Sequence, residues 1–369
     1  MAGSETDALL VDRPESLPAT NGADAPKPRS PWWYSWRRLK RNRRALVGLC
    51  IVVLLVFLAL FADLLAPMDP NRQILEYVEK PSGFKGNVLL ARSESSSYGS
   101  EMIPIERYRI DGDSVRYVDV LGRDNVIARS ALAGADESEW HQEPVYLLGA
   151  DKFGRDVLSR LIEGGQISLL VGFSAEIIAL LIGVTLGALA GYYRGWVDAV
   201  VMYMANVIWS FPFILLVIAF SLALGHGLWQ SFVAIGVASW VDVCRIVRGQ
   251  FFSLRETEYV EATRALGFGS VRTIFRHMLP NAIGPITVIA TAGFASAIIA
   301  EASLSYLGLG VQPPQASWGQ MIRDGQGYIS AGKNWGLAIY PSIAIALAVF
   351  GFNMLGDGLR DAFDPKMRT

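Results

Sequence analysis

The segment 258–281 combines residue types that suit it to grip another protein rather than to catalyse a reaction. Glu261 offers a carboxylate to a partner surface. The small side chains of Ala262 and Ala265 would let that surface approach the backbone closely. These features predict a docking element, which a generic connecting loop would not need.

The same segment predicts two short helices joined at a glycine, an arrangement that we call the elbow (residues 256–280). Gly267 can adopt the left-handed conformation that a helix C-terminus requires, so the first helix should run over about 256–266 and stop there. Ser270 is placed to cap the second helix, and Pro280 should end it. The elbow would then be a rigid, compact projection.

Covalent chemistry has no visible candidates in this chain. The three histidines, His141, His226 and His277, lack the spacing of metal ligands, so no metal site is predicted. The two cysteines, Cys50 and Cys244, sit in apolar runs and are too few for a disulfide framework. A Gly-x-x-x-x-Gly-Lys-Ser/Thr phosphate loop is missing, so the chain should not hold ATP itself.

The composition indicates that the elements that position the elbow lie in a membrane. The chain has 369 residues, of which 18% are charged, below the ~25% of soluble domains, and its mean hydropathy is +0.32. Such a chain is expected to be solvated partly by lipid, with its 36 glycines used for close helix packing. The formal net charge of -1 leaves no basic footprint, so nucleic acid is not expected as a partner.

Six segments are long enough to cross the ~30 Å hydrocarbon layer. They are 45–66, 168–190, 200–224, 231–252, 282–307 and 335–355. The third contains Pro212 and should kink there. The fourth contains Asp242 and Arg245, so part of it must face protein or the cytoplasmic interface.

A stripe of small residues marks the second of these segments. Gly183, Gly187 and Gly191 recur every four residues, which predicts close helix contact; a direct part in a pore is the alternative.

Basic residues predict the orientation of the chain. With both termini inside, the short inside stretches carry 16 Lys and Arg and the short outside stretches carry 2. Residues 1–31 are polar and predict a disordered cytoplasmic tail. The segment 32–66 joins an aromatic and basic stretch to the first spanning helix, which predicts contact with membrane lipid at the interface. A nucleic-acid arm is the alternative for this stretch, but a spanning segment follows it at once.

The segment 67–150 should then lie outside the cell membrane. It holds 14 acidic and 9 basic residues. Asp111-Gly112-Asp113 separates alternating apolar residues and predicts a hairpin, so we expect a small β-containing extracytoplasmic insertion. It either braces neighbouring loops or offers a docking surface to an external partner. The remainder, 151–369, would be the membrane core, with a cytoplasmic loop over 253–280.

The elbow resembles the coupling-loop signature of ABC-importer permeases. It reads Glu261-Ala262-Thr263, Gly267, Ile274 and Leu279-Pro280, with Thr263 where alanine is usual. The stretches 148–158, 304–314, 317–319 and 353–361 resemble, in the same order, the dipeptide/oligopeptide/nickel group of these permeases, and the chain is similar to its C-type members. The resemblance covers about 145–365 and the first spanning helix. It does not cover the tail or most of the insertion.

This resemblance implies an all-α polytopic membrane protein with six transmembrane helices, the type I ABC-importer permease fold. It implies the translocation-pore subunit, and no enzyme, of an ATP-driven, binding-protein-dependent importer of dipeptides or oligopeptides in a bacterial inner membrane. The implied partners are a second permease subunit, two ATP-binding-cassette ATPase subunits and an extracytoplasmic substrate-binding protein. ATP and Mg²⁺ would be held by the ATPase subunits, and no cofactor by this chain.

Three groups of site residues follow from the resemblance and the residue types. The first is an ATPase-coupling loop made of Glu261, Ala262, Thr263, Ala265, Gly267, Leu279 and Pro280. The second is a possible translocation path at Glu301 and Ser305. Glu301 lies ~30 Å along a helix from Asn281, near its outer end, and could attract the amino group of a peptide or pair with a partner chain. The third is an inner-face anchor formed by Asp357, Arg360 and Asp361.

Other readings remain open. The same architecture could import nickel chelates, glutathione or sugar-like ligands. A polytopic membrane enzyme or receptor would need His, Asp or Ser clustered at one membrane depth, and the sequence shows no such cluster. Pro313, Pro314 and Trp318 shape an outer loop that either supports docking of a binding protein or re-enters the bundle.

Overall fold

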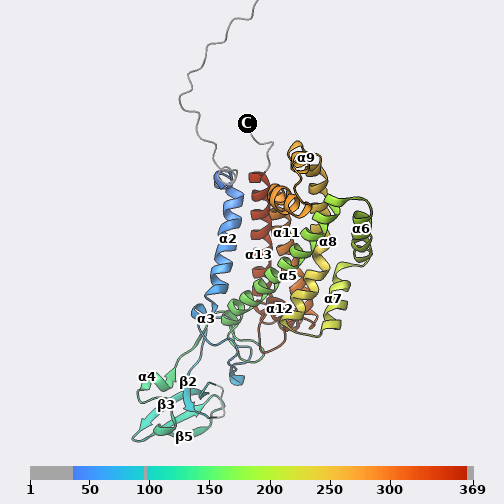
Figure 1. The fold of residues 1–369 in the computed structure, drawn as a ribbon. Coiled ribbons are helices and arrows are strands. Elements are labelled where there is room, and N and C mark those ends of the chain that lie inside the picture. Colours follow the sequence, from blue (N-terminus) through green and yellow to red (C-terminus); the bar gives the residue numbers. More distant parts are fainter. Residues whose placement is uncertain (1–35, 95–97, 364–369) are drawn as a thin grey trace, which may run out of the picture.

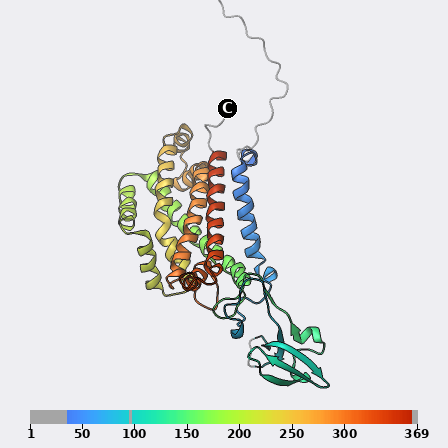
Figure 2. The ribbon, with the colours of Figure 1, turned by 180° about the vertical axis from the view of Figure 1, so that it is seen from behind.

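A bundle of long helices carries a smaller region of strands at one of its ends in the computed structural model, which describes residues 36–94 and 98–363 (Figures 1 and 2). The helices of the bundle are α2 (Arg43–Leu60), α3 (Ala62–Leu65), α5 (Val157–Tyr193), α6 (Gly195–Trp209), α7 (Phe213–Leu224), α8 (Leu228–Arg255), α9 (Glu258–Ala265), α10 (Ser270–Arg272), α11 (Leu279–Tyr306), α12 (Trp318–Ser330) and α13 (Gly336–Phe363). The predicted tail over 1–31 and the aromatic residues that follow it up to 35 lie outside the described residues.

Within the described part of the chain, five helical stretches are long and apolar enough to cross a membrane. They are α2, α5, α8, α13 and the stretch Ser270–Tyr306, which includes α10 and α11. The predicted third crossing is broken at Pro212, where a kink is predicted, into α6 and α7, which are bent by 92°. Pro212 is the N-cap of α7, and a proline there cannot continue the preceding helix because it lacks an N–H and clashes with the turn before it. The chain therefore has six crossings only if this bent pair makes one of them.

Backbone-to-backbone contact joins α5 to α8. A Cβ added at Gly183 would lie 2.6 Å from the Cβ of Val243, and one at Gly187 would lie 2.5 Å from the carbonyl oxygen of Cys244. A Cβ at Gly191 would lie 2.5 Å from the Cβ of Phe251. The stripe of small residues thus faces a neighbouring helix along its whole length, as the packing prediction requires.

A second close contact joins α2 to α13, although they are far apart in the sequence. The Cβ of Ala45 fills the space that a side chain at Gly358 would need, and Gly48 and Gly351 approach the opposite helix in the same way. Figure 1 shows the two helices side by side at one edge of the bundle. The amino-terminal span is therefore fixed to the last one.

The strands lie between α3 and α5 in the sequence. They are β1 (Phe84–Lys85), β2 (Val88–Arg92), β3 (Ser100–Asp111), β4 (Ser114–Asp119), β5 (Asp124–Ala128), β6 (His141–Gln142) and β7 (Val145–Tyr146), with the short helix α4 (Glu137–Trp140) before β6. Five of them form an antiparallel sheet in the order β5-β4-β3-β2-β6, and β1 pairs with β7. Leu89, Ile105, Val115, Leu132 and Trp140 form the core of this sheet.

The hairpin predicted around Asp111-Gly112-Asp113 is present. Asp111 pairs with Ser114 across the turn between β3 and β4, and Tyr108 pairs with Tyr117. Gly112 has a φ of +59°, a conformation that glycine adopts without strain.

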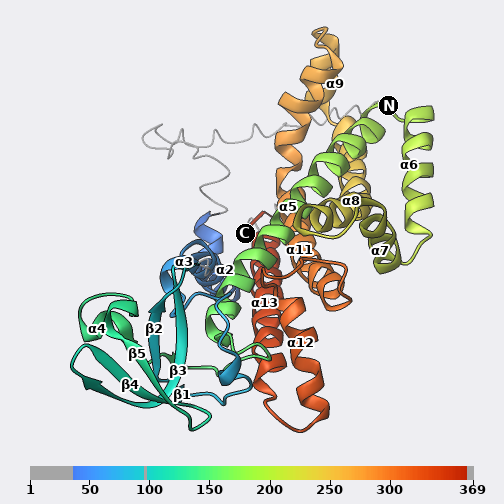
Figure 3. The same cartoon turned by 90° about the horizontal axis from the view of Figure 1, so that it is seen from below.

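The helix α12 was not predicted as an element. Its N-cap is Ser317, whose hydroxyl accepts a hydrogen bond from the backbone N–H of Gln320. Trp318 is buried, and its indole N–H donates to the carbonyl of Leu161 at 2.9 Å. The outer loop therefore re-enters the bundle. Seen from the strand end, α12 lies beside α13 (Figure 3).

The close contact between α5 and α8 predicts that one added methyl group will lower the stability of the protein. Gly187→Ala would place its Cβ against a backbone oxygen, so we expect a loss of about 1–3 kcal/mol in the free energy of unfolding. Gly249→Ala on α8 is the matched control, since no atom lies within 4 Å of the added Cβ. Thermal unfolding of both variants in detergent checks this, and equal midpoints would refute the close contact.

Candidate functional site

The first helix of the elbow ends as the glycine predicts. Leu266 is the C-cap of α9, and Gly267 follows with a φ of +75°. The N–H of Gly267 donates to the carbonyl of Arg264 at 2.9 Å, and that of Phe268 donates to the carbonyl of Thr263 at 3.0 Å. This pair of bonds is a Schellman motif, which satisfies the last carbonyls of the helix and turns the chain.

One side of the elbow is anchored in the bundle. Val260, Ile274 and Met278 are buried and pack against Val247 and Phe251 of α8. Because apolar side chains fill this side, the elbow is fixed to the end of α8 rather than loosely attached.

Thr263, the residue that departs from the usual alanine, points into this anchored side. Its hydroxyl donates to the carbonyl of Val260 at 2.7 Å and lies 3.5 Å from the hydroxyl of Thr273. Both threonines are buried. The extra hydroxyl is therefore satisfied inside the elbow and leaves its outer surface unchanged.

The other side of the elbow is exposed. Glu261, Ala262 and Ala265 lie on it. The large apolar side chains of Leu266 and Val271 beside them are 71% and 68% exposed. We call the exposed residues Glu261, Ala262, Ala265, Leu266, Val271 and Phe275 the elbow face. An apolar patch with an acidic residue beside it is typical of a protein interaction surface.

The second half of the elbow differs from the prediction. The N-cap of α10 is Gly269, and the side chain of Ser270 makes no capping bond. Pro280 does not end the helix either, because the chain continues as a π-helix over Thr273–Met278 and then as α11. Pro280 lacks a backbone N–H, but it lies in the first turn of α11, just after the wider π turn. A proline is tolerated at that position, so the helix continues. Leu279 and Pro280 therefore lie inside a continuous helix that runs from the elbow into the membrane.

Glu301 is enclosed by its own chain. It has no exposed surface. The hydroxyl of Ser168 on α5 donates to its Oε2 at 2.8 Å, and the hydroxyl of Ser305 donates to its Oε1 at 2.7 Å. The Ser168 oxygen also accepts from the backbone N–H of Trp318 at 3.2 Å. Glu301 therefore joins α11, α5 and the start of α12, and its partners lie in this chain rather than in a second one.

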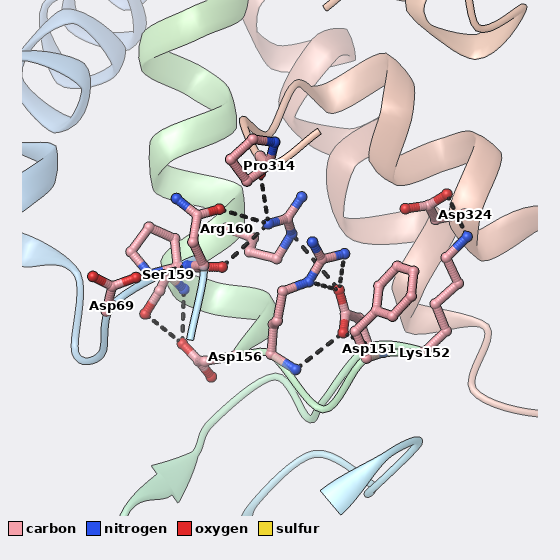
Figure 4. A network of polar contacts seen from close by, with 12 residues as sticks. Asp69, Asp151, Lys152, Asp156, Ser159, Arg160, Pro314 and Asp324 are labelled. Carbon is pink, nitrogen blue, oxygen red and sulfur yellow. Dashed lines mark hydrogen bonds and ion pairs between the residues drawn. The ribbon is translucent and has the colours of Figure 1, made fainter. Parts of the chain in front are cut away.

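A charged cluster lies where the strand region meets the bundle (Figure 4). Asp151 accepts hydrogen bonds from the backbone and guanidinium of Arg155, with an Nη2–Oδ2 distance of 2.6 Å, and lies 3.7 Å from the Nε of Arg160. Arg160 is fully buried and donates to the carbonyls of Pro70 at 3.1 Å and Pro314 at 3.5 Å. This cluster joins the chain before the strands, the start of α5 and the loop before α12.

The same corner contains the cap of the longest helix. Asp156 is the N-cap of α5 and accepts from the backbone and hydroxyl of Ser159 at 2.7 and 2.6 Å (Figure 4). Burial raises the pKa of Asp156, and the two hydrogen bonds oppose that shift. Sequence reasoning assigned no role to this corner. The alternation of acids and arginines over 151–160, just before an apolar run, was the available signal.

The inner-face residues are only partly joined. The side-chain oxygen of Asn42 caps α2 by accepting a hydrogen bond from the backbone N–H of Arg44 at 3.1 Å. The side-chain nitrogen of Asn42 donates to the carboxylate of Asp361 on α13 at 3.1 Å. Among the described residues, no partner is found for the side chains of Asp357 and Arg360. The polar link between the ends of α2 and α13 is therefore the pair Asn42 and Asp361.

Comparison with known proteins gives matches along most of the chain. The family described as the inner membrane component of binding-protein-dependent transport systems matches residues 183–369, and the N-terminal transmembrane domain of oligopeptide transport permease C matches residues 30–81.

Three curated relatives cover nearly the same length. The dipeptide transport system permease protein DppC of Alkalihalophilus pseudofirmus is 36% identical, over 98% of this chain and 97% of the relative. The oligopeptide transport system permease protein OppC of Bacillus subtilis is 33% identical, over 95% and 96%. The glutathione transport system permease protein GsiD of Pectobacterium atrosepticum is 34% identical, over 92% and 93%.

Removing an acidic charge should cost more stability in the buried cluster than in an exposed ion pair. Asp151→Asn leaves the guanidinium of Arg155, only 4% exposed, without its carboxylate, so we expect a loss of about 3–5 kcal/mol in stability. Asp111→Asn breaks the exposed pair with Arg116 and should cost less than about 1 kcal/mol. Thermal unfolding of the purified protein measures both; similar losses would contradict a buried cluster.

Proposed function

The chain belongs to the family of inner membrane components of binding-protein-dependent transport systems, and from this premise we propose that it forms half of the pore of an ATP-driven importer of dipeptides and oligopeptides. The family is that of the permease subunit of ABC importers, in which ATP hydrolysis belongs to separate subunits. The chain is a multi-pass, mostly helical protein of the inner membrane. The observation that carries the proposal is the elbow, which presents an exposed face at one end of a membrane bundle.

We propose that the end of the bundle that carries α9 is cytoplasmic. The basic residues over 37–44 and the last turns of α13 lie at this same end, and the strands lie at the opposite end (Figure 1). The excess of basic residues on the inner side supports this orientation. Both termini would then be cytoplasmic, and the strand region extracytoplasmic, with α6 and α7 together as one of six crossings.

We propose four parts for the chain on this basis. Residues 1–31 form a cytoplasmic tail, and 32–66 an interfacial segment with the first transmembrane helix. Residues 67–150 form the extracytoplasmic insertion. Residues 151–369 form the permease core of type I importers, with the coupling loop over 253–280.

The elbow face is proposed to dock on one ATPase subunit. A single elbow serves a single ATPase, so a complete importer needs a second permease chain and two ATPase subunits. The continuous helix from α10 through α11 supports a mechanical role, because a displacement of the elbow would move a transmembrane segment as a rigid body. Closure of the ATPase pair would bring the two elbows together and switch the pore between its inward and outward openings.

This chain would supply no catalytic residue and no cofactor site. ATP and Mg²⁺ would be bound by the ATPase subunits, and cargo would be delivered by an extracytoplasmic substrate-binding protein. The exposed hydrogen bond between Asn42 and Asp361 supports an anchoring role for the inner-face group.

Dipeptides and oligopeptides are the proposed cargo, since two of the relatives above carry those names. Glutathione, itself a peptide with free carboxylates, is the second candidate, and a glutathione permease at 34% identity supports it.

Coupling is tested at the turn of the elbow. Gly267 has a φ of +75° and no atom within 4 Å of an added Cβ, so a side chain there costs backbone strain and makes no clash. Gly267→Val should disfavour the turn by about 1–2 kcal/mol or more and lower uptake per ATP hydrolysed about tenfold. Gly269→Val is the matched control, because Gly269 is equally open and has a φ of −63°.

The measurement is peptide uptake and ATP hydrolysis by the four-subunit importer with its binding protein in proteoliposomes. The assignment of the elbow fails if both variants keep the wild-type ratio of uptake to hydrolysis. Assembly of each variant with the ATPase subunits is checked first by co-purification.

Cargo is tested in the same proteoliposomes. We expect labelled dialanine to be taken up at least ~10-fold faster than labelled glutathione at equal subsaturating concentrations. The opposite ratio would favour the glutathione alternative, and uptake of neither would count against peptide import.

A further inference from the structure

An open cavity of about 500 Å³ lies at the strand end of the bundle. Its walls come from the turn before α5, the end of α11, the loop over 308–314 and α12. A volume of this size falls in the range of ~300–1,000 Å³ that small-ligand sites occupy. We call it the outer cavity.

One wall of the outer cavity carries an unsatisfied acceptor. Gln320 of α12 is only 8% exposed, and its Oε1 has no hydrogen-bond partner among the residues that the structure describes. Its backbone N–H donates to the hydroxyl of Ser317 at 3.3 Å, which fixes the residue in the first turn of the helix. A buried carbonyl oxygen without a donor is unfavourable, and the N–H of a ligand would satisfy it once the enclosed carboxamide turns toward the cavity.

The same wall carries an uncommitted positive charge. Arg323 lines the outer cavity one helical turn after Gln320, and no ion-pair partner for it exists within 36–94 and 98–363. The other two cations of the cavity are already paired: Lys152 lies 2.9 Å from Asp324, and Arg155 lies 2.6 Å from Asp151. The free guanidinium is therefore the group that would recognise an anionic ligand.

The two negative groups at the outer cavity are already engaged. Asp324 lines the cavity but lies 2.9 Å from Lys152. Ser305 lines the outer cavity, but its hydroxyl donates to Glu301, which lies fully buried behind it. The groups that face the cavity therefore favour a carboxylate over an ammonium group. Glu301 is therefore not placed to attract the amino group of a peptide in this cavity.

We propose that the outer cavity binds the C-terminal end of a peptide on its way to the pore, with its carboxylate on Arg323 and its last N–H on the carboxamide oxygen of Gln320, which turns toward the cavity to accept it. The two side chains are one turn apart on one face of α12, about 5–6 Å between Cβ atoms. Consecutive Cα atoms of a peptide are ~3.8 Å apart, so one terminal residue spans both groups. This assignment rests on the proposed function and adds a cargo contact to it.

Binding to the importer alone tests the site. The probe is the dipeptide Ala-Ala, titrated into the ATPase–permease complex in lipid nanodiscs without the binding protein and followed by saturation-transfer NMR. We expect binding to the wild-type complex, a rise in the dissociation constant of at least ~10-fold for Arg323→Gln, and near wild-type affinity for Arg323→Lys, which keeps the charge. Ala-Ala amide, which lacks the carboxylate, should bind weakly to every variant.

Lys333→Gln is the matched control, since it removes an exposed charge just after α12 that does not line the cavity. Unchanged affinity for Ala-Ala in Arg323→Gln, or equal binding of the amide, would overturn the proposal. So would a loss of affinity for the binding protein in Arg323→Gln with dipeptide binding intact, because the cavity would then be a protein-docking surface. Peptide uptake by the wild-type proteoliposomes distinguishes a failure of this site from a failure of the proposed function. If peptide is taken up but Arg323 has no effect on binding, only the cavity site is wrong. If no peptide is taken up, the proposed function is wrong.

Discussion

Backbone contact between α5 and α8 positions the membrane part of the molecule. The three glycines of α5 lie where a methyl group would reach Val243, the carbonyl of Cys244 or Phe251. Lipid tails are as apolar as the side chains, so helices gain little free energy merely by exchanging lipid contacts for contacts with one another. Their association therefore depends on such close approach and on polar contacts. Because α8 leads directly into the elbow, the surface proposed to meet an ATPase is held by the same contact.

Polar side chains stabilise the opposite end of the bundle. Arg160, Asp151 and Glu301 are all buried there; Arg160 and Glu301 are hydrogen-bonded to elements distant in sequence, and Asp151 is ion-paired to Arg160. Burying charges is costly unless every group has a partner, so these residues specify one arrangement of the strand region, α5, α11 and α12. Gln320, whose buried carboxamide oxygen has no partner among the described residues, and the exposed Arg323 share one wall of one cavity, and that is the physical reason to look there for a ligand.

The elbow is a short segment that is anchored to the bundle on one side and exposed for contact with a partner protein on the other. Its buried residues alternate with those of the elbow face at helical spacing, so one side packs on α8 while the other remains exposed. The glycine turn fixes the angle between α9 and the π-helix, and the proline after it is absorbed by the first turn of α11. A displacement at α9 is thereby passed into a transmembrane segment without a flexible joint.

The sequence by itself determined five of the six predicted spanning segments, the hairpin at Gly112 and the helix stop at Gly267, because each depends on local properties: a long apolar run, alternation about a turn, and a residue free to adopt a positive φ. Ser270 and Pro280 misled because the helix begins at Gly269, one residue before Ser270, and continues through a π-helix into the first turn of α11, where a proline is tolerated. Tertiary structure alone decided that Glu301 is enclosed by Ser168 and Ser305, that Asp151 meets Arg160, and that Gln320 and Arg323 face an open cavity. These contacts join residues up to 133 positions apart, and nothing in local sequence specifies how helices so distant pack together.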